Sequence, residues 1–173
     1  KRIRSMYRIP RQYYSEKAIS EEYLTKVFER AKRCDIKNNQ AYAEFFVARN
    51  RMMLTILLVT GIRKEQLRSL KCSDVAHDEH GVTITVTRQK SMDKSRKQKY
   101  LPMKAVLPDG STVRDAFYSY FFNEKRILGT YFFYGADADR PLGKSNLYQI
   151  FDRMGFNPHA FRHTSATRTA QVT

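Results

Sequence analysis

Apolar residues recur at helical spacing over several stretches of this chain and alternate with polar residues over one shorter stretch. The first helical stretch follows Ser20, a good N-cap residue. Glu21 and Glu22 come next, and acidic residues favour the first turn of a helix. Its apolar positions are Tyr23, Leu24, Val27, Phe28 and Ala31. The pattern predicts an amphipathic helix that starts at Ser20.

A second helix is predicted over about residues 40–60. Its second half is apolar around most of the circumference, which indicates that this part is buried. Gly61 follows at the position where a left-handed helix cap costs least, and a short helix through Leu67 and Leu70 comes next. The chain is therefore expected to turn sharply after residue 60.

Strict alternation appears at residues 82–86, where Val and Ile alternate with Thr, and it predicts a strand with one buried face. The expected partner is Lys99–Met103, in which Pro102 favours a sheet edge or a strand end. The two segments form a predicted hairpin. The connecting Gln89–Gln98 is polar and lacks Gly, so we expect a long mobile tip rather than a tight turn.

Helical spacing returns at about residues 112–126 and 145–154, with Gly155 as the cap of the latter. A last helix is expected to start at His159 and to run to the end of the sequence. The order of helices, a small β-hairpin or meander, and further helices predicts a mostly helical α+β domain.

Length and composition favour one globular domain. The chain has 173 residues, of which 42% are hydrophobic, enough for one core but too few for two. Residues 1–17 are basic and without periodicity, so we interpret them as a linker or arm, solvated or lying on phosphates, and residues 18–173 as the domain. With 32 Lys and Arg against 17 Asp and Glu, the net charge is +15, which points to a polyanionic partner.

Several classes of protein are disfavoured. Two cysteines cannot supply the disulfide framework of a small secreted domain. The longest apolar run is far shorter than the roughly 20 residues that cross a bilayer, and the basic N-terminus lacks a signal peptide's apolar stretch. We expect a cytoplasmic protein that does not insert into membranes.

A cluster of basic residues is predicted on and beside the hairpin, with Asp93 as its single acid. Its members are Arg88, Lys90, Lys94, Arg96, Lys97, Lys99 and Lys104. Such density suits contact with a phosphate backbone, although a solvated loop explains the composition equally well.

Two further groups could carry chemistry. Arg63 directly follows a capped helix end in Thr60-Gly61-Ile62-Arg63, and an Arg whose backbone is held in place can bind a phosphate bidentately. His159 and Arg162 would share one helix face, which places a cation beside a proton donor. The other histidines, His77 and His80, are expected in a polar turn without a cysteine at ligand spacing, so no metal site is predicted.

The order and intervals of these groups resemble the catalytic domain of the tyrosine recombinase (phage integrase) family. The resemblance rests on the Thr-Gly-x-Arg box, a hairpin lysine and His-x-x-Arg-His-Thr. It implies strand transfer on double-stranded DNA through a 3′-phosphotyrosyl intermediate, without metal or nucleotide cofactor. Arg63 and Arg162 would hold the non-bridging oxygens and His159 would bond the same phosphate. Lys90, or alternatively Lys94, would protonate the leaving 5′-oxygen.

The resemblance also implies DNA contacts and assembly. The residues expected to bind DNA are Arg88, Lys94, Arg96, Lys97 and Lys99, and family members act as tetramers on DNA. Gln66 stands where the family generally has Asp or Glu, three residues after the first arginine. No tyrosine follows Arg162. We therefore expect a fragment of a longer recombinase that does not cleave DNA alone, although another subunit could supply the tyrosine.

Two other interpretations remain open. A non-catalytic DNA-binding module with the same fold would explain Gln66 and the missing tyrosine. A general RNA- or DNA-coating protein would use aromatic residues for stacking, as in Tyr131–Tyr134. The apolar neighbours of these aromatic residues favour the core instead. Tyr148, the tyrosine nearest to the His-x-x-Arg box, is likewise expected to lie in the core.

Overall fold

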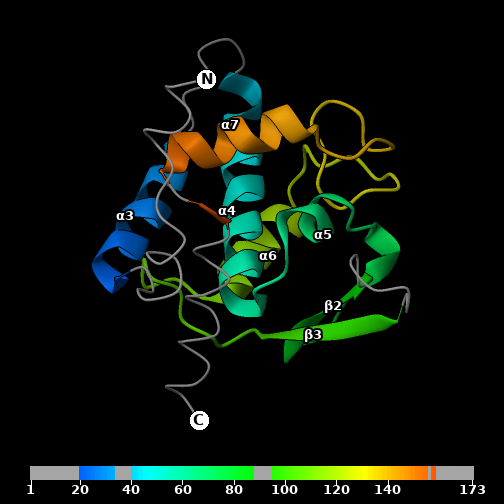
Figure 1. Ribbon diagram of the computed structural model, residues 1–173, viewed down its shortest axis with the longest axis horizontal. Helices are drawn as coiled ribbons and strands as arrows, with labels where there is room; N and C mark the ends of the chain where they lie inside the picture. The colour runs from blue at the N-terminus through cyan, green and yellow to red at the C-terminus, as the bar shows by residue number, and fades with distance from the viewer. Residues whose placement is uncertain (1–19, 34–39, 88–94, 156, 159–173) are drawn as a thin grey trace, which may run out of the picture.

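The structure is a computed structural model that describes residues 20–33, 40–87, 95–155 and 157–158. The described helices surround one long central helix, α4, and a three-stranded antiparallel sheet lies at one end of the molecule (Figure 1). Labels follow Figure 1, in which the first described helix is α3. The mostly helical α+β architecture expected from the sequence is confirmed.

Helix α3, Glu21–Ala31, begins as the sequence predicts. The Ser20 hydroxyl accepts a hydrogen bond from the backbone N–H of Tyr23 at 3.2 Å, which satisfies one of the free N–H groups of the first turn. The buried face of α3 consists of Leu24, Val27, Phe28 and Ala31. Tyr23, expected on this face, is exposed.

The central helix α4, Ala43–Thr60, follows a single 3₁₀ turn at Gln40–Tyr42. Residues 52–58 are all buried, because α4 contacts α3, α5, α6 and β3 on different sides. Burial of each large aliphatic side chain contributes roughly 1.5–3 kcal/mol to folding. This helix therefore fixes the position of the chain that leaves its C-terminus.

The sheet contains β1, Val75–His77, β2, Gly81–Thr87, and β3, Arg96–Pro102, in that order. A 3₁₀ turn at Cys72–Asp74 leads into β1. Strands β2 and β3 form the predicted hairpin, and Pro102 is the last residue of β3. Strand β3 already begins at Arg96. The part of the expected tip at residues 88–94 lies outside the described residues.

Strand β1 was not predicted, and it corrects the interpretation of His77. His77 lies in this strand and not in a polar turn. Its ring packs against the rings of Phe117, at a centroid distance of 5.0 Å, and Phe121, at 4.8 Å. His77 therefore has a structural role, because its ring packs between the sheet and α6.

Helix α6, Val113–Phe121, is shorter than predicted, and α7 spans Lys144–Met154. Helix α6 ends at Phe121 because the Asn123 side chain accepts the N–H of Lys125 in a turn that replaces helical hydrogen bonding. Gly155 ends α7 in the left-handed conformation, with φ 74°, as predicted. Tyr148 is 70% exposed on α7, so its expected place in the core was wrong.

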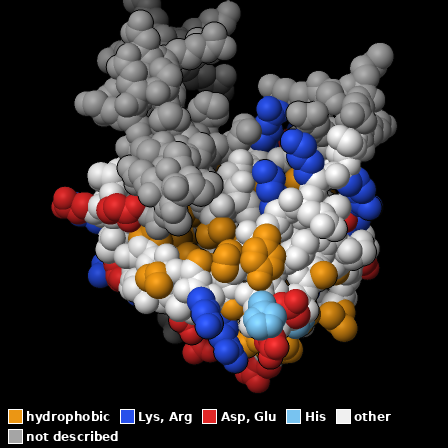
Figure 2. Space-filling view, turned by 90° about the horizontal axis from the view of Figure 1, so that it is seen from below, with side chains coloured by type: hydrophobic (Ala, Val, Ile, Leu, Met, Phe, Trp, Pro, Cys, Tyr) orange, Lys and Arg blue, Asp and Glu red, His pale blue; other side chains and the backbone are white. Residues whose placement is uncertain are grey.

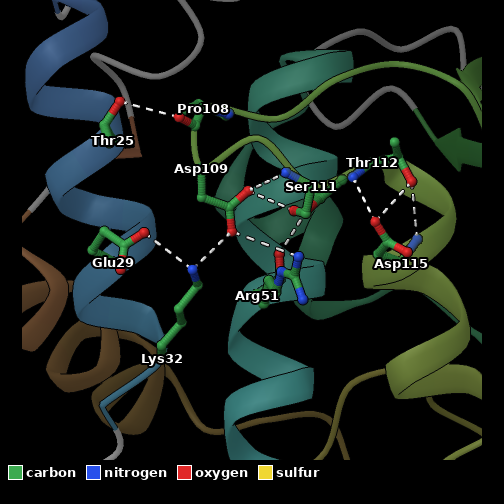
Figure 3. A network of polar contacts seen from close by, with 10 residues as sticks. Thr25, Glu29, Lys32, Arg51, Pro108, Asp109, Ser111, Thr112 and Asp115 are labelled. Carbon is green, nitrogen blue, oxygen red and sulfur yellow. Dashed lines mark hydrogen bonds and ion pairs between the residues drawn. The ribbon is translucent and has the colours of Figure 1, made fainter.

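A polar network around Asp109 joins α3, α4 and the loop before α6 (Figure 3). Its side chain lies 3.6 Å from both Lys32 of α3 and Arg51 of α4, and it accepts hydrogen bonds from Ser111. Burial alone would raise the pKa of Asp109, but the Ser111 hydrogen bonds and the two cations lower it below its ordinary 3.8. The carboxylate therefore holds the central helix in place as an anion.

Candidate functional site

The candidate site begins where α4 ends and α5, Lys64–Arg68, starts. Gly61 adopts the left-handed conformation, with φ 67°, and its N–H donates to the carbonyl of Leu57 at 3.0 Å. Ile62 is buried, and Arg63 then takes the N-cap position of α5 with an extended backbone. The predicted Gly cap is confirmed, and it turns the chain so that Arg63 leaves the core.

The backbone of Arg63 is held on both sides. Its N–H donates to the Gln66 side chain at 2.9 Å, and its carbonyl accepts the N–H of Leu67 at 2.9 Å. Leu67 is fully buried, so the second bond ties Arg63 to the core. Arg is a poor N-cap residue because its side chain cannot accept a hydrogen bond from the helix. Gln66 at the third helical position makes the reverse contact of a capping box, because its side chain accepts the N–H of Arg63 itself.

The half-buried Arg63 side chain differs from its neighbour Arg68. The Arg68 guanidinium lies 3.3 Å from a Glu65 carboxylate oxygen and donates to the carbonyl of Leu142 at 2.8 Å. Within the described part of the chain, the Arg63 guanidinium has no hydrogen bond or ion pair. Arg63 is thus the cation of this pair that is chemically suited to an external anion.

Gln66 connects this box to the sheet. While its oxygen accepts from Arg63, its Nε2 donates to the backbone carbonyl of Thr87, the last residue of β2, at 3.0 Å. The start of α5 and the end of β2 are therefore adjacent. Sequence reasoning noted Gln66 only as a departure from a family pattern. A bond from its side chain to a distant backbone carbonyl leaves no signal in the sequence.

The basic residues of β3 lie on two faces of the sheet. Lys97 and Lys99 pair with Val86 and Ile84, so the two lysines share the sheet face of these buried side chains. Arg96 has the opposite orientation. Lys97 is exposed and Lys99 is half-buried at the sheet edge.

Arg96 pairs with Thr87, and its guanidinium donates to the Asp74 carboxylate at 3.0 Å. The other oxygen of Asp74 accepts the backbone N–H of Lys71 at 3.0 Å. Figure 2 shows the molecule from the sheet end, with one group of Lys and Arg side chains in the upper half of the view and a second group beside acidic side chains in the lower half.

Several predicted site residues lie outside the described residues. They are Arg88, Lys90, Lys94, His159 and Arg162. Of the four residues predicted to be catalytic, the structure places only Arg63, and their convergence on one phosphate stays a prediction. Among the described residues, no group of three or more His, Cys, Asp or Glu side chains could hold a metal ion.

The sequence profile of the Phage integrase family matches residues 29–172, which is most of the chain. The chain belongs to this family. A search of curated protein sequences finds no match. None of the described helices is both long enough and apolar enough to span a membrane.

Solved structures of tyrosine recombinases share the fold of this phage integrase domain. The XerH site-specific recombinase bound to difH substrate has a TM-score of 0.64 at 19% identity, over 90% of this chain and 43% of XerH. For XerA recombinase the TM-score is 0.62 at 22% identity, over 95% of this chain and 52% of XerA. The Tn1549 transposon integrase in complex with circular intermediate DNA gives 0.50 at 18% identity, over 90% and 53%. The chain spans about half the length of these proteins.

Proposed function

We propose that this domain is the catalytic part of a site-specific DNA recombinase, or integrase, that cuts and rejoins DNA strands. The observation that carries the proposal is Arg63, whose backbone is fixed on both sides while its guanidinium is unpaired among the described residues. Membership of the phage integrase family supports it. So does the fold shared with XerH bound to difH substrate and with the Tn1549 integrase in complex with DNA.

In the proposed reaction, a tyrosine hydroxyl oxygen attacks the scissile phosphorus and forms a 3′-phosphotyrosyl bond, and the bond to the 5′-oxygen breaks. Arg63 and Arg162 hold the two non-bridging oxygens and neutralise the charge that grows in the transition state. His159 hydrogen-bonds the same phosphate. Lys90, with Lys94 as the alternative, gives a proton to the leaving 5′-oxygen.

The phosphotyrosyl bond conserves the energy of the broken phosphodiester, so the proposed reaction needs no nucleotide cofactor. In this proposal Arg63 and Arg162 provide the charge stabilisation for which other enzymes use a metal ion. Attack by the 5′-hydroxyl of another strand reverses the step and releases the tyrosine. We propose that this tyrosine is not one of the 173 residues and comes from a further segment or a neighbouring subunit. Assembly as a tetramer on DNA, in the cytoplasm of a bacterial or phage-infected cell, is part of the same proposal.

The proposed DNA surface surrounds the hairpin. It consists of Arg88, Lys94, Arg96, Lys97 and Lys99, of which the last three are described on β3. Neutralisation of DNA phosphates by such residues releases counterions, so binding should weaken as the salt concentration rises. The formal net charge of +15 favours the same partner.

A non-catalytic DNA-binding module is the second candidate, and Gln66 at the usual acidic position favours it. A duplex nicked beside the cleavage point separates the two candidates, because the short released strand diffuses away and traps the covalent intermediate. We expect the full-length protein that contains this sequence to form an adduct stable to denaturation and sensitive to protease. DNA binding without an adduct, on a duplex that carries the natural target, would support the module instead.

A further inference from the structure

A cavity of about 510 Å³ lies at the N-terminal end of α4, whereas Arg63 follows the C-terminal end. The first turns of α4 form one wall, and α7, which crosses this end of α4 in Figure 1, contributes another. Phe46 in this wall and Thr60, the last residue of α4, are about 21 Å apart along the helix axis. Cavities that hold ligands measure about 300–1,000 Å³. This cavity is therefore large enough for a ligand and distinct from the region of Arg63.

Aromatic rings form the base of the cavity. Phe45 is buried and packs against the rings of Tyr134, at a centroid distance of 5.6 Å, and Phe46, at 5.5 Å. Tyr42 continues this row toward solvent, 6.4 Å from Phe46. The Tyr134 hydroxyl accepts the backbone N–H of Ile127, which fixes the rim relative to the base. An apolar side chain that entered the cavity would leave water and pack against these rings.

The charged side chains that line the cavity are cations. The guanidinium of the buried Arg49 lies 4.8 Å from the centroid of the Phe46 ring. The exposed Lys125 places its ammonium 5.6 Å from the centroid of the Tyr42 ring, and Arg153 is exposed on α7. Among the described residues, no Asp or Glu lines the cavity. The lining is therefore complementary to a ligand that combines an apolar group with negative charge.

The apolar surface continues beyond the cavity. Ile127 on the rim is 54% exposed, and Leu128, the next residue, is 84% exposed. A small molecule inside the cavity would leave this surface uncovered, whereas a polypeptide that crossed the rim would cover it. A second copy of this chain is a poor occupant, because each copy carries a formal net charge of +15 and the two would repel. The page of charges and exposed residues thus favours a different, acidic protein.

We propose that this cavity binds an acidic segment of a different protein. The segment inserts an aromatic or branched aliphatic side chain against Phe45 and Tyr134, and its carboxylates face Lys125 and Arg153. Such a partner would contact the end of α4 that is opposite to Arg63. The inference does not rest on the proposed function, because neither Arg63 nor the hairpin belongs to the cavity.

A library of random peptides, selected on the immobilised full-length protein, supplies the probe. Selected peptides are synthesised with a fluorescent label, and their Kd is measured by anisotropy. We expect them to combine several Asp or Glu residues with an aromatic or branched aliphatic residue. Replacement of the acids by amides, or of the apolar residue by Ser, should weaken binding by about 10-fold or more. A library that gave no binder, or binders without acidic residues, would overturn the inference.

Charge reversal tests where the acidic residues of the peptide bind. Lys125→Glu combined with Arg153→Glu should weaken binding by at least about 10-fold, because two attractions become repulsions. Arg140→Glu combined with Lys144→Glu makes the same change of charge at exposed positions outside the cavity lining. This control should weaken binding by less than about threefold, since salt screens distant charges. Equal losses would show attraction to the charge of the whole domain and would contradict the inference.

A bulky substitution tests whether the apolar side chain enters the cavity. Gln149 is exposed on α7 and lines the cavity, so the indole of Gln149→Trp should occupy it and weaken peptide binding by at least about 10-fold. Tyr148→Trp, at the neighbouring exposed position outside the lining, should bind as the wild-type protein does. Urea unfolding shows whether both variants keep their fold, and the charge-reversal pair decides if Gln149→Trp does not. Unchanged binding by a folded Gln149→Trp would overturn the inference.

Two other occupants would give different results. If DNA occupied the cavity, a labelled duplex would compete with the peptide and bind more weakly to Gln149→Trp than to Tyr148→Trp. If a second copy occupied it, the full-length protein would self-associate without DNA in sedimentation, and Gln149→Trp would be monomeric. Either result would overturn the inference. Adduct formation is measured in none of these experiments, so a failure here leaves the proposed function intact, and a failure to form the adduct leaves this inference intact.

Discussion

Arg96 and Lys97 are neighbours in β3, but their side chains lie on opposite faces of the sheet. Lys97 pairs with Val86, and Lys99, two positions further, pairs with Ile84. Side chains alternate along a strand, so the two lysines share a face that Arg96 does not share. A flat run of phosphates that contacts one of these lysines could therefore contact the other.

Removal of Lys97 and Lys99 should weaken DNA binding and should also make binding less dependent on the salt concentration. The slope of log K against log salt concentration is negative. For Lys97→Ala combined with Lys99→Ala, we expect the magnitude of this slope to decrease by about 2, since each lost phosphate contact changes it by about 0.9. Fluorescence anisotropy with a labelled duplex over a salt series measures the slope.

The control for this experiment removes two exposed charges elsewhere, with Arg140→Ala and Lys144→Ala. Its slope should stay close to that of the wild-type protein. Arg96→Ala should reduce the slope less than the double lysine variant, because Arg96 is already paired with Asp74. Equal slopes for the double lysine variant and the control would show that Lys97 and Lys99 do not contact DNA phosphates.

The buried carboxylate of Asp109 predicts a pH dependence of stability. Its pKa is lowered below 3.8, so it stabilises the folded state fully above that pH and loses this effect as the pH falls through the folded-state pKa. Asp109→Asn should lower the free energy of unfolding at pH 7 by roughly 1–3 kcal/mol, because Arg51 loses its carboxylate partner and Lys32 keeps only Glu29. Urea denaturation at pH 7 and between pH 5 and pH 3 measures both effects.

In this series the stability of Asp109→Asn should fall less steeply below pH 4 than that of the wild-type protein. Asp152→Asn, a substitution at an exposed position on α7, should follow the wild-type curve. Parallel curves for Asp109→Asn and the wild-type protein would mean that Asp109 does not act as an anion that holds α3 and α4 together.

The left-handed turn before Arg63 makes a further prediction. Gly61→Ala should lower the free energy of unfolding by about 1–2 kcal/mol, because a Cβ at φ 67° meets the following carbonyl. Gly135→Ala is the control, since a Cβ there would meet Leu142 at an ordinary 3.8 Å. Urea unfolding compares the two variants. Equal free energies of unfolding would show that the left-handed turn does not require glycine at residue 61.

Much of the fold could be predicted because it follows from local rules. The apolar second half of α4, the cap at Gly61 and the alternating strand β2 each reflect a periodicity or a backbone preference that neighbouring residues reveal. Strand β1 has only three residues, too few to show alternation, and it exists because it pairs with β2. Tyr148 was expected in the core of its helix, but it is exposed, because it follows the buried Leu147 and neighbours on a helix point about 100° apart.

The site was harder to predict than the fold. Arg63 could be singled out because the residues around it constrain its backbone. The bond from Gln66 to Thr87 depends on how α5 and β2 pack in three dimensions, and the sequence does not encode that packing locally. The ion pair between Arg96 and Asp74 was missed for the same reason, since the basic cluster was considered only as a charge density.

The role of Arg63 in cleavage is the central claim, and single-turnover cleavage of the nicked duplex by the full-length protein tests it most directly. We predict that Arg63→Ala lowers the rate of adduct formation at saturating DNA by roughly 10²–10³-fold, the loss typical of one charge-stabilising donor. Arg140→Ala, which removes a charge whose side chain is 84% exposed, should leave the rate unchanged. Equal rates for Arg63→Ala, Arg140→Ala and the wild-type protein would contradict the claim.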